Sequence, residues 1–183
     1  MKMTVKNGPA NAQLGKLIDG LHDNKLRVGW FPSAVYPNGM PVANIAAIQE
    51  FGSSNGAIPS RSFMRTTMVE QESAWRTFIT NRGKKIAAGS MTTEQLADQF
   101  GLRVAGDIAK KISKITSPAL SPVTLQLRYW KNAGVKITGK KMVGQAARLV
   151  GQGINNTLSG SAAKPLVDSR MMMESVTHTV TKS

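Results

Sequence analysis

The sequence predicts an α+β domain, in which a small antiparallel sheet is packed by several helices and a long extended arm projects from it. Three observations predict this class. Several segments carry apolar residues at helical spacing, two short segments near opposite ends of the chain have the pattern of strands, and the stretch 116–141 has neither pattern. The 183 residues suggest a single domain, 1–183, large enough to bury a core without cross-links.

The first part of the chain predicts a helix, a strand and a second helix. An amphipathic helix over 9–22 is predicted by apolar residues at spacings of three and four: Ala10, Leu14, Leu17, Ile18 and Leu21. The segment from Leu26 to Phe31 is β-branched and aromatic, with Val28 and Trp30 on one face, and predicts a strand. After a proline-rich loop, Pro41 suits the first position of a short helix over 42–51, which Gly52 ends.

Two longer helices follow. Ser60 can cap a helix that runs to about Arg82, and Gly83 is expected to break it. Its apolar stripe comprises Met64, Met68, Gln71, Trp75, Phe78 and Ile79. Thr92 with Gln95 then has the pattern of a capping box. The helix after it has the cleanest amphipathic pattern in the chain and should line the core with Leu96, Phe100, Val104, Ile108, Ile112 and Ile115.

The last third changes character. Two Ser-Pro pairs, two glycines and several basic residues predict that 116–141 is an extended arm or long loop. Helical spacing returns over 142–158, where glycines weaken the pattern. The final segment 176–181 alternates valine and histidine with threonine and predicts a strand whose natural partner is the strand near Leu26.

Charge is distributed unevenly along the chain, which has a formal net charge of +14. Between Arg103 and Arg148 there are ten basic residues against one acid, Asp107. A polyanion, an acidic protein surface and a solvated face that only aids solubility all fit this pattern. The three successive methionines at 171–173 cannot all face one core, so we expect at least one to meet a partner.

The residues that usually carry chemistry are sparse. Cysteine is absent, which excludes disulfides, thiolate metal sites and a cysteine nucleophile. The two histidines, His22 and His178, have no third ligand candidate nearby in the sequence, and Glu70 and Glu72 point to different sides of their helix. Nucleotide-binding and hydrolase motifs are missing, as is any apolar run long enough to span a membrane. We therefore expect no catalytic residue, cofactor or metal, and no membrane partner.

One stretch combines several shaped residues around a loop: "IAAIQEFGSSNGAIPSRSFMR", residues 45–65. It resembles a segment typical of the tail-completion and head–tail joining (neck) proteins of long-tailed bacteriophages. In that family a helix ending in (H/E)-(F/Y)-G precedes IP-(A/S)-R-(P/S)-F-(L/M)-R and a long helix. The matching residues here are Glu50, Phe51, Gly52, Ile58, Pro59, Ser60, Arg61, Ser62, Phe63, Met64 and Arg65.

Two later segments extend the resemblance over roughly 10–181. "SPALSPVTLQLR" is similar to the PPLSP-x-T arm of the family through Leu120, Ser121, Pro122 and Thr124. "KPLVDSRMMMESVTHTV" is similar to its KPL-(I/V)-D-(T/S)-G-x-L-x-x-S-(I/V) ending through Lys164, Pro165, Leu166, Val167, Asp168, Ser169, Ser175 and Val176. Arg170 stands where that ending usually has glycine, which puts the tight turn at this position in doubt.

The resemblance implies a non-enzymatic virion protein, assembled in the host cytoplasm, that forms a sixfold ring at the head-proximal end of the tail. Its expected partners are other copies of itself, the tail tube protein and connector or stopper proteins. A closed ring needs two different patches on each copy that fit each other. We expect one patch to comprise Phe51, Gly52, Ile58, Pro59, Arg61, Phe63 and Arg65, with Phe51 and Phe63 bracketing the loop and the two arginines offering charge to a neighbour. The alternative is that this loop packs only on its own domain.

Other residues are assigned to further contacts. The arm would reach an adjacent subunit or ring through Leu120, Pro122, Arg128 and Trp130. Lys131, Lys136, Lys140 and Lys141 would face genome DNA in the channel or an acidic partner, and Pro165, Asp168 and Met171 would mark the C-terminal motif. A function of a different class, a basic nucleic-acid-binding protein, remains open, and it predicts duplex affinity that falls steeply with salt.

Overall fold

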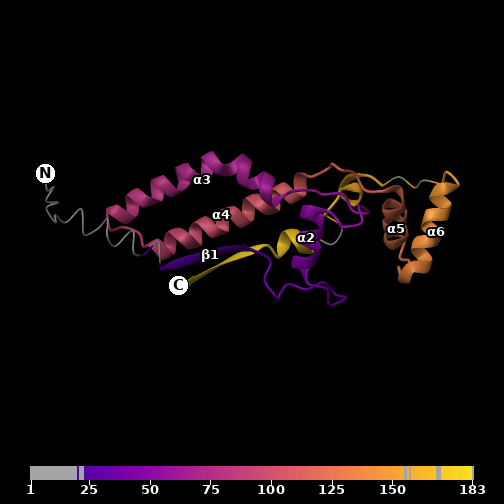
Figure 1. The fold of residues 1–183 in the computed structure, drawn as a ribbon, viewed down its shortest axis with the longest axis horizontal. Coiled ribbons are helices and arrows are strands. Elements are labelled where there is room, and N and C mark those ends of the chain that lie inside the picture. The colour runs from indigo at the N-terminus through magenta and orange to yellow at the C-terminus, as the bar shows by residue number, and fades with distance from the viewer. Residues whose placement is uncertain (1–19, 21–22, 155, 157, 168–169, 183) are drawn as a thin grey trace.

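The fold is that of a computed structural model, which describes residues 20, 23–154, 156, 158–167 and 170–182. In chain order its elements, labelled as in Figure 1, are β1 (Asn24–Gly29), α2 (Val42–Phe51), α3 (Met64–Ala87), α4 (Thr93–Lys114), α5 (Pro122–Asn132), α6 (Gly139–Gly151), the 3₁₀ turn η1 (Gly160–Ala163), α7 (Met171–Glu174) and β2 (Thr177–Lys182). The helix predicted over 9–22 lies outside the described residues, apart from Gly20. The predicted α+β class is confirmed.

Three layers form the body of the molecule, with α4 in the middle. Figure 1 shows α3 on one side of α4 and the two-stranded sheet on the other. Helix α4 packs against α3, β1 and β2. In the sheet, β1 and β2 are antiparallel, with Leu26 opposite Val180 and Val28 opposite His178. This is the predicted pairing of the two strands. Lys25 and Arg27, which alternate with Leu26 and Val28, are exposed.

The start of α4 has the predicted capping box. The Thr92 hydroxyl accepts a hydrogen bond from the Gln95 N–H at 3.1 Å, and the Thr92 N–H donates to Gln95 Oε1 at 3.0 Å. One glycine on this helix, Gly101, lies against His178 of β2, where an added Cβ would stand 2.8 Å from the His178 Cβ. Its missing side chain therefore sets how closely α4 approaches the sheet.

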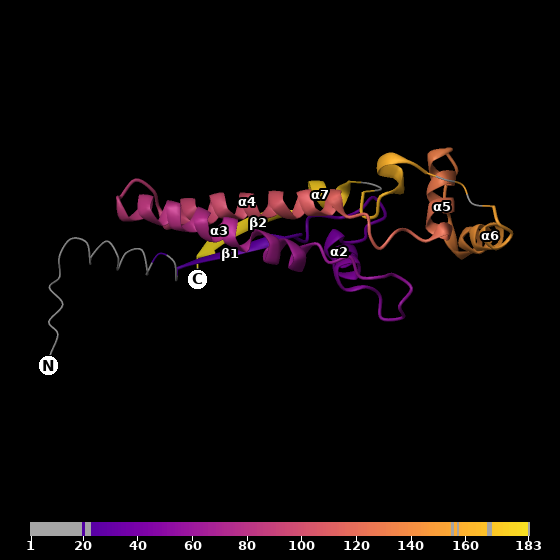
Figure 2. The same ribbon diagram turned by 90° about the horizontal axis from the view of Figure 1, so that it is seen from above.

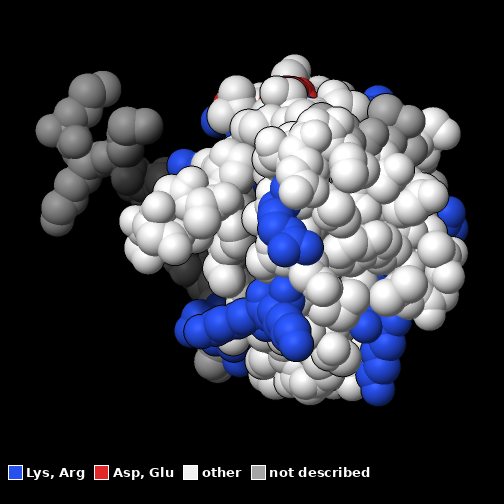
Figure 3. Space-filling model, turned by 90° about the vertical axis from the view of Figure 1, so that its right-hand side faces the viewer, with Lys and Arg blue, Asp and Glu red and all other residues white. Residues whose placement is uncertain are grey.

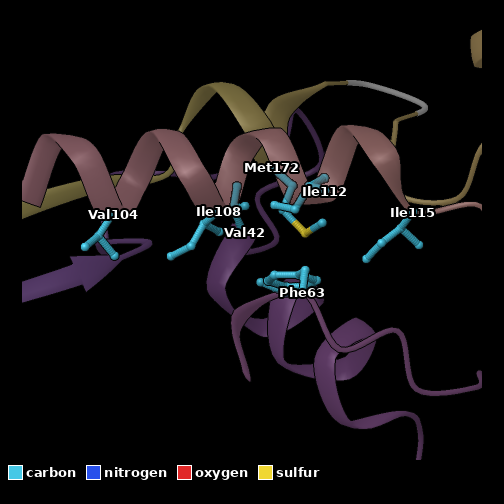
Figure 4. Close-up of a cluster of buried hydrophobic side chains, with 8 residues drawn as sticks. Val42, Phe63, Val104, Ile108, Ile112, Ile115 and Met172 are labelled. Carbon is cyan, nitrogen blue, oxygen red and sulfur yellow. The ribbon is translucent and has the colours of Figure 1, made fainter. Parts of the chain in front are cut away.

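The hydrophobic core lies where α4, α2 and α7 meet, as Figure 4 shows. Its buried members are Val42, Ala46, Phe63, Val104, Ile108, Ile112, Ile115 and Met172. The prediction that the helix after Thr92 lines the core is therefore confirmed. Of the three successive methionines only Met172 is fully buried, while Met171 and Met173 are partly exposed at the edge of this cluster.

The boundaries of α3 differ from the prediction. Ser60 does not cap this helix, which begins at Met64 with Phe63 in the capping position and without a cap from its own side chains. Gly83 lies within the helix, which continues to Ala87. A glycine inside a helix costs only about 1 kcal/mol relative to alanine, so it weakens a helix without ending it.

The segment 116–141, for which the sequence predicts an extended arm, contains regular helix. Ser121 caps α5 by accepting a hydrogen bond from the Thr124 N–H at 3.2 Å, and Pro122 occupies the first turn. Helices α5 and α6 pack on each other as a helical hairpin that projects from one end of the body (Figures 1 and 2). In place of the predicted 142–158, α6 runs over 139–151. The predicted arm is thus largely helical, though it does project.

The turn at Arg170 is present although glycine is not. Arg170 adopts a left-handed backbone conformation with φ of 55° immediately before α7. Its carbonyl accepts hydrogen bonds from the N–H groups of Met173 and Glu174. This conformation is sterically less favourable for arginine than for glycine.

Candidate interaction site

The carboxylate of Glu50, near the end of α2, lies at the beginning of α3. Its Oε2 accepts hydrogen bonds from the N–H groups of Phe63 at 2.7 Å and Met64 at 2.9 Å. Its Oε1 accepts from the Ser62 hydroxyl at 2.8 Å and the Arg65 N–H at 3.2 Å. The first N–H groups of a helix have no partner within the helix and carry partial positive charge. Glu50 therefore caps α3 from a different helix.

Arg65 completes this arrangement with an ion pair. Its Nε lies 3.0 Å from Glu50 Oε1, and its Nη2 donates to the Glu50 carbonyl at 3.1 Å. Burial alone raises the pKa of Glu50, but the hydrogen bonds from the Met64 N–H, Arg65 and Ser62 outweigh burial, so that the pKa lies below its usual value. Glu50 is 3% exposed and its oxygens are fully engaged, so the carboxylate stabilises structure and is not available to a substrate.

The chain reverses direction directly after α2, at Gly52. This residue has φ of 84°, and an added Cβ would lie 3.0 Å from the Ile58 carbonyl oxygen. The returning segment is held by hydrogen bonds from the Arg61 N–H to the Gln49 carbonyl at 2.7 Å and from the Ser60 hydroxyl to the Glu50 carbonyl at 2.7 Å. Both the left-handed conformation and the close approach require glycine here.

Arg61 connects this loop to the base of the helical hairpin. Its Nε donates to the Pro118 carbonyl at 2.7 Å, and its Nη2 donates to the Ala119 carbonyl at 3.0 Å. Nη1 donates to Gln49 Oε1 at 3.0 Å. The side chain is buried, and its pKa is lowered first by this burial and then by the charge of Arg128. Arg61 thus acts as an internal clamp between α2, the loop and the segment before α5.

Two of the residues predicted to contact a neighbouring subunit are therefore internal. Phe63 is fully buried and makes an edge-to-face contact with Trp30, with ring centroids 5.6 Å apart. The Arg61 guanidinium donates to backbone carbonyls of its own chain, as described above. Neither side chain offers a surface to a partner, so this part of the prediction is wrong, as is the bracketing of the loop by Phe51 and Phe63. The alternative, packing within the domain, holds for these two residues.

The remaining residues of the predicted patch lie at or near the surface. Phe51 is 66% exposed, and the Arg65 guanidinium lies 4.9 Å from the centre of its ring. Beside Phe51 is a hollow of about 430 Å³ whose lining includes Val28, Trp30, Ala43, Ala47 and Met64. We call Phe51 with this hollow the α2 patch.

On the other side of α2, Ile58 and Pro59 line a second hollow. Its volume is also about 430 Å³, and it extends to Leu120 and Arg128 at the base of the hairpin. The Arg128 Nη1 donates to the carbonyls of Ala162 at 3.0 Å and Lys164 at 2.8 Å, so α5 is tied to the C-terminal segment of its own chain. Pro122 is exposed, whereas Leu120 and Trp130 are partly buried.

The residues predicted to face DNA or an acidic partner lie on the hairpin. Lys131, Lys136, Lys140 and Lys141 are all exposed. Of the C-terminal motif, Pro165 is buried and Met171 is partly buried against the core, while Asp168 lies outside the described residues. The structure therefore separates the predicted residues into an internal network, the α2 patch and a basic hairpin.

Sequence reasoning missed the capping role of Glu50. One signal was present, because residues 61–65 offer the start of α3 no acidic side chain, although an exposed N-terminus commonly has one. His178 forms a further pair across the body, with its Nε2 lying 2.8 Å from Asp98 Oδ1. Within the described residues no three His, Cys, Asp or Glu side chains are placed to hold a metal ion, and no helix is long and apolar enough to cross a membrane.

No protein family, curated protein or solved structure matches the chain.

Proposed function

We propose that the protein is a structural component of the neck of a long-tailed bacteriophage. In this proposal it forms a ring of six copies at the head-proximal end of the tail, completes the tail and joins it to the head. Its partners are neighbouring copies, the tail tube protein and connector or stopper proteins. The observation that carries the proposal is the α2 patch, in which the residues of the Glu-Phe-Gly and Ile-Pro-Ser-Arg motif hold an exposed phenylalanine beside an apolar hollow.

Rigidity of this region supports an assembly role. The network around Glu50 and Arg61 fixes both ends of the loop through hydrogen bonds of 2.7–3.2 Å, so the position of Phe51 is set before any partner binds. A preorganised surface loses little conformational entropy on association. An exposed aromatic side chain next to a hollow is the kind of feature that supplies much of the binding free energy in protein interfaces.

The experiment compares two apolar truncations. Phe51→Ser removes the projecting side chain of the α2 patch, and Val69→Ser is its control, because Val69 is 78% exposed on α3 and is not among the residues that line the hollow. The purified wild-type chain should form closed rings. The fraction of chain in rings should rise with protein concentration in sedimentation velocity, and the rings should be visible by electron microscopy. Phe51→Ser should abolish the rings while leaving the thermal unfolding of the monomer nearly unchanged, whereas Val69→Ser should retain them.

A test in the virus addresses the proposed role itself. Removing this reading frame from a phage that carries it should leave filled capsids and tails that are not joined. Intact particles with finished tails, assembled without this polypeptide, would contradict the proposal. Rings that survive Phe51→Ser would contradict only the assignment of the α2 patch.

A further inference from the structure

Four lysines of the helical hairpin gather near its tip. Lys131 lies in the last turn of α5, Lys136 in the connection, and Lys140 and Lys141 in the first turn of α6. All four are exposed, whereas Arg148 lies in the last turn of α6, at the other end of that helix. Figure 3 views this end of the molecule and shows Lys and Arg at several places on it, with acidic atoms visible only at its upper edge. We call these four lysines the basic tip.

Acidic residues are absent from a long stretch of sequence around the basic tip. From 108 to 167 the chain has ten Lys and Arg residues and no Asp or Glu. In the body, by contrast, some basic side chains pair with acids, as Lys111 does with Glu70 at 2.6 Å and Arg76 with Glu72 at 2.8 Å. Among the described residues, Lys136, Lys140 and Lys141 make no ion pair. Their charges therefore act outward.

The direction of α6 adds to the positive electrostatic potential at the tip. α6 begins at the tip with no acid in its first turn, and Thr138 does not cap it through its side chain. The positive end of the helix dipole thus coincides with Lys140 and Lys141, an arrangement that repels cations and lowers the stability of the isolated helix. A bound anion would remove this repulsion.

We propose that the basic tip binds the phosphate backbone of duplex nucleic acid. The kind of side chain favours this partner over an acidic protein, because lysine is depleted at the core of protein–protein interfaces, where arginine and aromatic residues are enriched. Lysine binds phosphate as a point charge and needs no particular base sequence. Single strands are disfavoured, since they are usually held by aromatic platforms and Tyr129 is the one exposed aromatic side chain of the described hairpin.

This inference does not rest on the proposed neck ring. The basic tip and the α2 patch lie on different elements, and the tip would bind a duplex whether or not the chain assembles. The two proposals can therefore fail separately.

The experiment measures binding of the full chain to a fluorescein-labelled duplex oligonucleotide by fluorescence anisotropy, over salt concentrations from about 50 to about 200 mM. The test variant is Lys136→Gln/Lys140→Gln/Lys141→Gln. Its matched control, Lys25→Gln/Lys84→Gln/Lys85→Gln, removes the same charge from exposed sites on β1 and α3. Circular dichroism melts establish that both variants fold.

The wild type should bind the duplex, with an affinity that falls as salt rises. The test variant should reduce the slope of log affinity against log salt by about 2.7, which is about 0.9 for each lysine that no longer neutralises a phosphate, and the control should leave the slope unchanged. An equal reduction in the two triple variants would overturn the proposal, because it would show that only net charge matters. Absence of duplex binding at about 50 mM salt, or tighter binding to a single strand or to poly-L-glutamate, would also overturn it.

Discussion

The body and the helical hairpin of this protein differ in how much apolar surface they bury and in where their charged side chains lie. The body surrounds α4 with an apolar core, and its buried charge at Glu50 is fully satisfied by internal hydrogen bonds. The hairpin has little interior beyond Ala146 and Gln126, which accepts a hydrogen bond from Asn156 at 2.9 Å, and its lysines are exposed. The body therefore provides a rigid packed core, whereas the hairpin provides an exposed positively charged surface. This division can be tested by substitution, beginning with the change that should cost most stability.

Removing the Glu50 carboxylate should have the largest effect. Glu50→Ala leaves the N–H groups of Phe63 and Met64 without their acceptor, and each buried donor left unsatisfied costs about 1–3 kcal/mol, so the total loss of unfolding free energy should be about 3–5 kcal/mol. Urea denaturation followed by circular dichroism measures this loss. The control is Glu72→Ala, which removes an exposed ion pair with Arg76 and should cost less than about 1 kcal/mol. Similar losses in the two variants would contradict the capping role of Glu50.

The same carboxylate should give the body a pH dependence. Because the pKa of Glu50 is lowered in the folded chain, its stabilisation is fully present above the unfolded value of about 4.5 and is lost as the pH falls from there through the folded value. Glu50→Gln is neutral at every pH. The difference in unfolding free energy between wild type and Glu50→Gln should therefore be constant near neutrality and shrink below about pH 4.5. A difference that stays constant or widens in acid would show that the ionised form is not the stabilising one.

A pair of glycines on α4 tests how tightly the body is packed. Gly101→Ala places a methyl group against the His178 side chain and should lower the unfolding free energy by about 1–3 kcal/mol. Gly106→Ala is on the same helix with open space around it, and it should raise stability by about 0.5–1 kcal/mol because alanine favours helix. Thermal melts of the two variants give the comparison. A stable Gly101→Ala would mean that α4 and the sheet can separate without cost.

The smallest effect on the body should come from a change within the hairpin. Ala146 lies on α6 and is fully buried, so Ala146→Glu should disturb the packing of α6 against α5. The tryptophan emission, to which Trp130 on α5 contributes, should shift to longer wavelength, whereas the unfolding free energy of the body should change by less than about 0.5 kcal/mol. A larger loss of body stability would show that the two regions fold as one unit.

Local chemistry explains which elements could be predicted. Thr92 and Gln95 are three residues apart, so their mutual capping is visible in the sequence and marks the start of α4. The alternation in both strands likewise predicts their pairing. The same local signal was available for α5, because Ser121 followed by Pro122 is a common helix start, but the surrounding prolines and lysines favoured an extended arm.

Long-range contacts explain what could not be predicted. The partners of Glu50 stand 12 to 15 positions later in the chain, and the two carbonyls that the Arg61 guanidinium binds stand 57 and 58 positions later, so no periodicity links them. The motif indicated where an important loop lies but not which side chains face inward. Phe51 and Phe63 are both apolar and flank the same loop, yet one is exposed and the other is buried. Only the packing of α2 against the core decides between them.

Arg61 has a mechanical consequence. It holds the backbone at Pro118 and Ala119, just before the hairpin, and its own backbone N–H is bonded to Gln49 on α2. A pull on the hairpin therefore reaches the segment that carries Phe51 through one guanidinium group, without passing along α4. One side chain thus links the hairpin to the α2 patch, and tension applied to the hairpin would be transmitted to Phe51.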